Sequence, residues 1–163
     1  MQEQEYVQCL SRGVVAIIGD VMLDHYVFGG VGRISPEAPV PVLQVASERF
    51  VLGAAANVAA NIAALGGTAH LVGVIGEDVA GGKISALLQE AGCSEAALVR
   101  TTDRPSIIKT RYVSGQQQIV RVDREVLTPL AADLTEAVKR AAEHAIANCD
   151  CVILSDYGKG VLA

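Results

Sequence analysis

The sequence predicts an α/β fold: a mostly parallel sheet covered by helices on both faces, with a small β layer projecting from it. Three short apolar runs, at residues 14–19, 68–75 and 151–154, are rich in β-branched side chains, as expected of strands buried on both faces. Helical patterns separate these runs, and alternation of strands with helices is typical of parallel sheets. With 163 residues the chain is long enough for one domain with a real core.

The first half of the chain predicts a strand, a β excursion, a helix and a second strand. After the strand at residues 14–19, residues 25–50 contain prolines that confine strands to an edge or to a separate small sheet. We therefore expect a hairpin that projects from the main sheet. The Ala-rich residues 53–65 predict a helix that ends at Gly66-Gly67, and residues 68–75 form the next buried strand.

The second half predicts a helix, a hairpin, a further helix and a third buried strand. The two hairpin strands are joined through Ser114-Gly115-Gln116, a turn signal. The elements are, in order, a helix near 83–91, a short strand at 96–99, hairpin strands at 106–113 and 118–122, a helix at 130–148 and a strand at 151–154.

Polar residues follow the predicted strands at what we expect to be one rim of the sheet. Ligands of parallel sheets bind beyond the carboxyl ends of the strands. Asp20 and Asp24 follow the first strand, and a carboxylate suits two vicinal sugar hydroxyls; alternatively, either one caps a turn or pairs with an arginine. The other segments at this rim are 76–78 and 155–159.

Two asparagines, Asn57 and Asn61, are four residues apart and share one face of an otherwise apolar helix. We expect at least one buried amide, bonded either to neighbouring backbone or to a ligand. Asp78 precedes a helix and is expected to be its N-cap rather than part of a phosphate loop, because Glu77 would oppose an anion.

Charged residues on the loop and hairpin are the remaining candidates. Asp156 and Lys159 are three residues apart between glycines, which indicates either a site at the rim or a simple ion pair within the loop. Lys109, Arg111 and Arg121 form a solvated strand face by default, and a phosphorylated substrate would make one or more of them phosphate ligands.

Composition excludes several classes of function. The net charge of −5 and the lack of a basic, aromatic-rich cluster argue against nucleic acid as a partner. The apolar runs are too short for a membrane span, and the acidic N-terminus does not resemble a secretory signal, so we expect a cytoplasmic protein with no membrane partner. The sequence contains no Walker A, HExxH or nucleophile-elbow motif, and the histidines at 25, 70 and 144 lack metal-site spacing. The cysteines at 9, 93, 149 and 151 are expected to be reduced and structural.

These segments together resemble the PfkB/ribokinase family of carbohydrate kinases. Its glycine-rich helix entry carrying an asparagine matches Leu52-Gly53-Ala54-Ala55-Ala56-Asn57-Val58-Ala59, with Gly66 and Gly76 at the later positions. Ala54 departs from the pattern, where the family usually has a second glycine. Segments 19–24, 33–42 and 155–160 look like those of heptose-7-phosphate kinases, which phosphorylate the anomeric hydroxyl in making the ADP-heptose precursor of lipopolysaccharide.

The resemblance implies a ribokinase-like fold and a set of substrate-binding residues. Asp24 would hold sugar hydroxyls, with Gly53, Ala54 and Asn57 lining the same pocket. Residues 25–50 and 106–122 would form a β lid that also builds a homodimer. The expected substrate-binding residues are Asp24, Gly53, Ala54, Asn57, Lys109, Arg111, Asp156 and Lys159, with Arg33 and Ser35 in the lid.

The resemblance further implies that residues 1–163 are the N-terminal, sugar-binding half of the domain, with an incomplete sheet. Family members carry a Gly-Ala-Gly-Asp motif, whose Asp is the general base, in a second half that binds ATP and Mg²⁺. This motif does not occur in the sequence, so we expect no catalytic residue here and no kinase activity from the chain alone. Three alternatives remain: a PfkB kinase for another sugar phosphate, a non-catalytic binding or dimerisation module, and a nucleotide-binding Rossmann domain. The last is disfavoured because GxGxxG does not follow the first strand.

Overall fold

A four-stranded sheet lies at the centre of the computed structural model, which describes residues 11 and 13–162. Its strands are β1 (Val14–Gly19), β4 (Thr68–Gly76), β5 (Leu98–Thr101) and β8 (Cys151–Ser155). They lie in the order β5–β4–β1–β8, and every neighbouring pair is parallel. The parallel sheet predicted from the apolar runs is confirmed.

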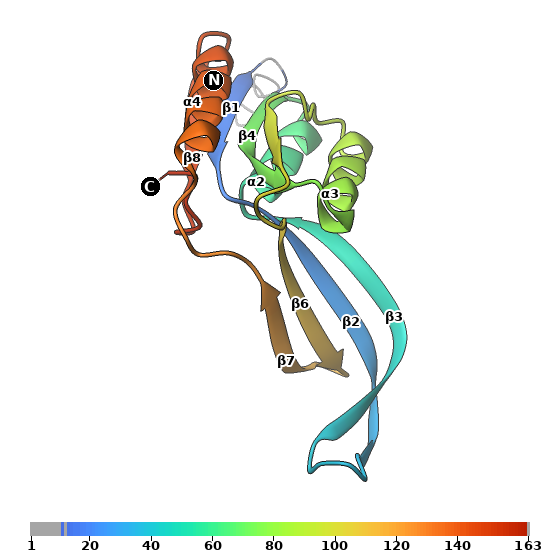
Figure 1. The fold of residues 1–163 in the computed structure, drawn as a ribbon. Coiled ribbons are helices and arrows are strands. Elements are labelled where there is room, and N and C mark those ends of the chain that lie inside the picture. Colours follow the sequence, from blue (N-terminus) through green and yellow to red (C-terminus); the bar gives the residue numbers. More distant parts are fainter. Residues whose placement is uncertain (1–10, 12, 163) are drawn as a thin grey trace.

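Among the described residues, three helices cover the two faces of this sheet: α2 (Ala54–Ala64), α3 (Val79–Glu90) and α4 (Ala132–Ile146). Figure 1 shows α2 and α3 together and α4 on the opposite side of the sheet. Alternate residues of β1 serve the two cores, because successive side chains of a strand point to opposite faces. Ile17 packs with residues of α2 and α3, whereas Ala16 and Ile18 pack with residues of α4.

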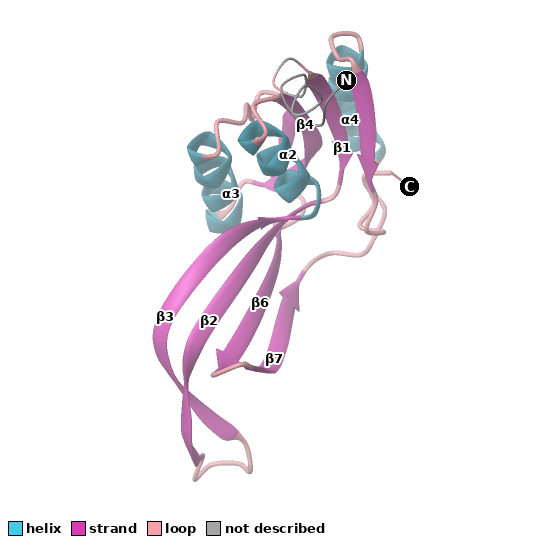
Figure 2. Cartoon of the chain, turned by 180° about the vertical axis from the view of Figure 1, so that it is seen from behind, coloured by secondary structure: helices cyan, strands magenta, loops and turns pink. Residues whose placement is uncertain are grey.

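A second sheet projects from the first, and we call it the projecting sheet. It contains β2 (Val21–Ile34), β3 (Pro41–Gly53), β6 (Ile107–Ser114) and β7 (Gln117–Arg124) in the order β3–β2–β6–β7. Figures 1 and 2 show it extending away from the helices, with the β2–β3 connection at its far end. Only Asp20 separates β1 from β2, so the chain passes directly from one sheet into the other. The β layer predicted from the prolines is therefore present, and its first hairpin is longer than residues 25–50.

Two expectations about burial were wrong. β8 is not a buried strand, because it lies at the sheet edge and α4 packs over β1, β4 and β5 instead; Val152 and Leu154 are 41% and 64% exposed. Neither Asn57 nor Asn61 is buried, because α2 turns its alanines at 55, 56 and 59 toward the core and leaves both amides on the exposed side.

The start of α3 also differs from the prediction. The glycines at 81 and 82 suggested a beginning near Lys83, whereas the helix begins at Val79. The Asp78 carboxylate accepts a hydrogen bond from the Gly81 backbone N–H at 2.8 Å, so the expected N-cap is confirmed. A Cβ on Gly81 would lie 2.1 Å from the Gly76 carbonyl oxygen, so the close approach to β4 explains a glycine in this helical turn. No helix among the described residues is long and apolar enough to cross a membrane.

Candidate functional site

Asp20 organises the rim where the two sheets meet. Its side chain is 1% exposed, and its two carboxylate oxygens accept hydrogen bonds from the backbone N–H groups of Tyr157, Lys159 and Val161 at 2.8, 3.0 and 3.3 Å. Its backbone carbonyl also accepts from the Ala55 N–H at the start of α2. Of the three roles considered for Asp20, capping a turn is the one observed: it fixes the loop after β8 against the end of β1.

Asp24 lies four residues further on, in β2, and pairs with an arginine of the neighbouring strand. The register places Asp24 beside Lys109 and Tyr26 beside Arg111. The Arg111 guanidinium donates to the Asp24 carboxylate and also to the Lys109 carbonyl oxygen. The Asp24 and Arg111 side chains are 21% and 19% exposed, so both remain within reach of a ligand.

Gly53 lies beside this pair, and neighbouring side chains leave no space for a side chain at this position. A Cβ built there would lie 2.9 Å from an Asp24 carboxylate oxygen and 3.1 Å from the Met22 side chain. The next residue, Ala54, has a φ of +49°, in the left-handed region that favours glycine. The family's second glycine is thus explained here by backbone conformation. Asn57 follows in the first turn of α2, with its side chain exposed.

The face of the projecting sheet that carries Asp24 is rich in cations. Lys109 donates to the Asp123 carboxylate at 3.0 Å, and Arg121 donates to the other oxygen of Asp123 at 2.9 Å. Arg49 and Arg111 both lie over the Tyr26 ring, with guanidinium carbons 5.4 and 5.2 Å from its centroid. The hydrogen bond from Lys109, and to a smaller extent that from Arg121, lowers the pKa of Asp123 below its usual value. The carboxylate of Asp123 therefore stays charged.

Glu125 connects this face to the loop that Asp20 holds. One carboxylate oxygen accepts from Lys159 at 3.0 Å, and the other from Lys109 at 3.4 Å. Burial alone would raise the pKa of Glu125, but the hydrogen bonds and charges of Lys159 and Lys109 bring it below the usual value. The Lys109 and Lys159 side chains are thereby held on opposite sides of one carboxylate. We call Arg49, Lys109, Arg111, Arg121 and Lys159, with the carboxylates of Asp24, Asp123 and Glu125, the basic cluster.

The opposite face of the projecting sheet is different in character. His25 stacks on Phe50 with centroids 4.2 Å apart, and Lys83 of α3 lies over the same ring. Together with Leu23, Ile108 and Val122 they line a cavity of 510 Å³ between this face and α3. The two faces of the projecting sheet therefore differ in character: the face that carries Asp24 is charged, and the opposite face is largely apolar.

A third carboxylate, Asp78, ties the start of β6 to the parallel sheet. Besides capping α3, it accepts from the Ser106 hydroxyl at 2.7 Å and from the Ser106 N–H at 3.0 Å. The same hydroxyl accepts from the Gly76 N–H at 2.9 Å. Burial would raise the pKa of Asp78, but the hydrogen bonds from Gly81 and Ser106 and the charge of Arg124 lower it.

The structure brings together most of the predicted site. Asp24, Gly53, Ala54, Lys109 and Arg111 adjoin one another, and Lys159 joins them through Glu125. Sequence reasoning missed Glu125, although an acid directly after the strand that faces Lys109 is a usable signal. It also missed Tyr26 and Arg49, whose alternation with Asp24 across the hairpin becomes visible only once the register is known.

Three predicted residues lie apart from this group. Asp156 is exposed and accepts from the Gly158 N–H of its own loop, while Lys159 pairs with Glu125, so the loop ion pair, one of the two alternatives, is not observed. Arg33 and Ser35 lie at the far end of the β2–β3 hairpin, about 30 Å along β2 from Asp24 at 3.3 Å per residue. Their role in a lid stays a prediction.

The described residues contain no cluster of potential metal ligands. Among them, no group of three or more His, Cys, Asp or Glu side chains is placed to hold a metal ion. The first turn of α2 has no side-chain cap and no acidic residue. We derive no step of phosphoryl transfer from these residues.

Comparison with known proteins gives one matching family and many curated relatives. The model of the pfkB family carbohydrate kinases matches residues 14–160. The chain is 55% identical over 150 residues to "Bifunctional protein HldE" of Azorhizobium caulinodans, covering 91% of this chain and 31% of that protein. It is 47% identical over 153 residues to "D-beta-D-heptose 7-phosphate kinase" of Bordetella bronchiseptica, covering 94% of this chain and 48% of the relative. The chain thus spans 31% and 48% of the length of these two relatives.

Solved structures share the fold at much lower sequence identity. A carbohydrate kinase from Agrobacterium tumefaciens superposes with a TM-score of 0.64 at 19% identity, covering 86% of this chain and 44% of that one. Ribokinase of Arabidopsis thaliana, solved with ribose and ATP, gives a TM-score of 0.58 at 18% identity, covering 88% of this chain and 53% of that one. At this level of identity the likeness establishes the ribokinase-like fold alone.

Proposed function

Because the chain belongs to the pfkB family of carbohydrate kinases, we propose that it forms the sugar-binding half of a kinase that phosphorylates the anomeric hydroxyl of heptose 7-phosphate. The reaction would serve the making of ADP-heptose for lipopolysaccharide. The proposal rests on 47% identity to a protein named D-beta-D-heptose 7-phosphate kinase, on 55% identity to one named Bifunctional protein HldE, and on one structural observation. That observation is the basic cluster beside Asp24, on the face of the projecting sheet that adjoins the rim.

In this proposal Asp24 binds sugar hydroxyls. A carboxylate has more acceptor sites than its single bond to Arg111 occupies, and its second oxygen faces the backbone of Gly53. Arg111 orients the carboxylate. Asn57, exposed in the first turn of α2, supplies an amide that both donates to and accepts from hydroxyl groups.

The cations of the basic cluster would bind the phosphate group of the substrate. Five cations face three carboxylates there, which leaves an excess of positive charge in a chain whose net charge is −5. Charge-assisted hydrogen bonds to phosphate contribute about 1.5–3 kcal/mol each, so a sugar without the phosphate should bind at least about tenfold more weakly. Arg33, Ser35 and Asp156 join the site only if the projecting sheet or the loop moves, and we assign them no contact.

We assign ATP, Mg²⁺ and the general base to the part of the longer relatives that this chain does not match. We also propose that two copies associate through the apolar face of the projecting sheet and that the protein works in the cytoplasm. The other candidate, a kinase for a different sugar phosphate, is favoured by the same basic cluster, since its charges recognise the phosphate rather than the sugar.

Titration calorimetry of the purified chain tests the sugar site. The ligands are D-glycero-D-manno-heptose 7-phosphate, fructose 6-phosphate and ribose. The variants are Asp24→Ala and, as a matched control, Asp133→Ala, which changes an exposed acid in the first turn of α4. We expect saturable binding of the heptose phosphate, lost in Asp24→Ala and kept in Asp133→Ala. Preferential binding of fructose 6-phosphate would favour the other candidate. No binding by a chain that circular dichroism shows to be folded would contradict the proposed site.

A further inference from the structure

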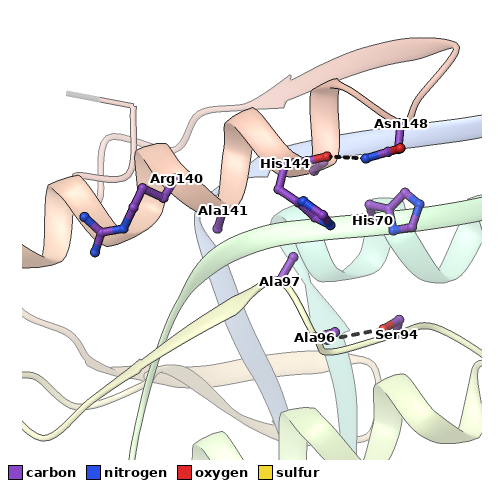
Figure 3. Close-up of a pocket in the computed structure, with 9 residues that line it drawn as sticks. His70, Ser94, Ala96, Ala97, Arg140, Ala141, His144 and Asn148 are labelled. Carbon is purple, nitrogen blue, oxygen red and sulfur yellow. Dashed lines mark hydrogen bonds between the residues drawn. The ribbon is translucent and has the colours of Figure 1, made fainter.

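A groove lies at the rim of the parallel sheet opposite to Asp20. His70, near the beginning of β4, forms one wall, and the last turns of α4 form the other. The groove encloses 590 Å³ (Figure 3). It lies on the β4–β5 side of β1, away from β8 and from the projecting sheet, so it is separate from the proposed sugar site.

The α4 wall carries three polar side chains at four-residue intervals. Arg140, His144 and Asn148 therefore lie along one stripe of the helix and its C-terminal end, one turn apart. Figure 3 shows Arg140 toward one end of the groove and His144 with His70 toward the other. Histidines 70 and 144, 74 positions apart in the chain, are thus brought to one place, which their spacing did not predict.

The groove offers hydrogen-bond donors and no acid. Its lining, within the described chain, contains no Asp or Glu, although acids outnumber bases in the sequence, 18 to 13. Three acids near it have other partners: Glu95 pairs with Arg100 at 2.7 Å, Asp150 accepts from the Val14 N–H at 2.8 Å, and Glu136, which also interacts with the charge of Arg140, pairs with Lys139 at 2.8 Å. Neither the His70 nor the His144 imidazole has a hydrogen bond or ion pair within the described residues, so both rings are available to a ligand.

The floor of the groove is apolar. Alanines 96, 97, 141 and 145 lie between the polar groups, so no side chain larger than a methyl group fills the middle. The Ser94 hydroxyl accepts from the Ala96 N–H at 3.2 Å, which leaves its own hydrogen free to donate. The compact or planar apolar part of a ligand could contact these methyl groups while its charged group reaches the donors.

We propose that this groove binds a small phosphate monoester with a compact apolar or planar body. A guanidinium binds phosphate with two parallel hydrogen bonds, and imidazole and hydroxyl groups add further donors. A carboxylate ligand would use the same donors less fully, because phosphate presents three acceptor oxygens. Since the donors are exposed, affinity should be modest, with a Kd on the order of 1 mM. The site is distinct in place and ligand from the sugar pocket.

Imidazole NMR signals of the three histidines test the proposal directly. The chain is titrated with phenyl phosphate, inorganic phosphate and phenol, and His25, in the cavity beside α3, is the internal control. We expect phenyl phosphate to shift the signals of His70 and His144 saturably while His25 stays still. Inorganic phosphate should bind more weakly, and phenol should not bind. Equal shifts at all three histidines, or no saturation, would overturn the proposal.

Two matched variants separate specific binding from general attraction. Arg140→Gln should weaken phenyl phosphate binding about tenfold, because it removes the bidentate donor. Lys139→Gln removes the same charge one residue away, where the side chain pairs with Glu136 in solvent, and should leave the Kd within about twofold. Equal effects of the two changes would show that the groove only attracts anions by charge and would overturn the site. Failure of heptose 7-phosphate binding would leave this result untouched, since the readouts come from different residues.

Discussion

At the scale of single residues, the rim is held by side chains whose role follows from conformation or from hydrogen bonds rather than from reactivity. Asp20 is buried to satisfy backbone N–H groups, whereas Asp24, four residues later, keeps acceptor capacity for a ligand. Two carboxylates with the same sequence signal therefore have different roles, set by which neighbours reach them. Ala54 is the third case: its φ of +49° is a cost that a glycine would not carry.

Replacing Ala54 by glycine should stabilise the protein. The left-handed conformation costs an L-residue about 1–2 kcal/mol, and the larger freedom of glycine in the unfolded chain offsets about 0.4–1 kcal/mol of that. We expect Ala54→Gly to raise the free energy of unfolding by about 0.5–1 kcal/mol, measured by urea denaturation. Ala55→Gly is the control: this neighbour is buried in the helix, and the change should destabilise. Similar losses in both variants would contradict the strain at position 54.

At the scale of elements, carboxylates fasten the projecting sheet to the parallel sheet. Asp78 joins the start of α3 to the start of β6 through Ser106, and Glu125 joins the end of β7 to the loop after β8 through Lys159. The projecting sheet is thus fastened where the β6–β7 hairpin begins and where it ends in the chain. These contacts add to the packing of β2 and β3 against α2 and α3, while the far part of the sheet extends away from the helices (Figure 2).

Removal of the Asp78 carboxylate should loosen both α3 and β6. Loss of an N-cap costs about 0.5–2 kcal/mol, and Asp78→Ala also removes the two bonds from Ser106, so we expect a loss of about 2 kcal/mol in unfolding free energy. Glu77→Ala changes the adjacent exposed acid, whose side chain bonds to none of the described residues, and should have little effect. Hydrogen exchange should show faster exchange at the start of α3 in the first variant only. Unchanged exchange there would contradict the anchoring role.

The stabilisation that Glu125 contributes should depend on pH. Its pKa is lower in the folded chain than in the unfolded one, so the folded state holds the charged form more strongly. The stabilisation is therefore complete above the ordinary glutamate pKa of about 4.3 and is lost as pH falls through the lowered value. We expect Glu125→Gln to be less stable than the natural chain at pH 7 and the difference to shrink toward pH 3, by urea denaturation. Glu136→Gln, at an exposed helical pair, should show almost no difference at pH 7; an equal loss there would count against a special role for Glu125.

At the scale of the whole molecule, the sequence predicted the architecture well and the site in part. Apolar runs and punctuating glycines located the parallel strands and the three described helices within a few residues, because these signals are local, whereas β2 and β3 were predicted only as one hairpin over residues 25–50. Burial of β8 and of Asn57 was predicted wrongly, because it depends on which elements lie above each strand or helix, a non-local property. The bridge from Lys109 through Glu125 to Lys159 joins residues 50 positions apart and needed the register of β6 and β7 to be seen.

The two faces of the projecting sheet lead to a prediction about assembly. Val120 and Val122, on the face opposite Asp24, are 48% and 51% exposed, a large apolar surface for a strand pair at a sheet edge. We expect the chain to sediment as a dimer near 100 µM and Val122→Glu to weaken association at least about tenfold, because a charge would be buried between the copies. Leu127→Glu alters an exposed apolar residue beyond β7 and should leave the dimer intact. A chain that sediments as a monomer at every concentration, or that dissociates equally in both variants, would show that the partner copy does not use this face.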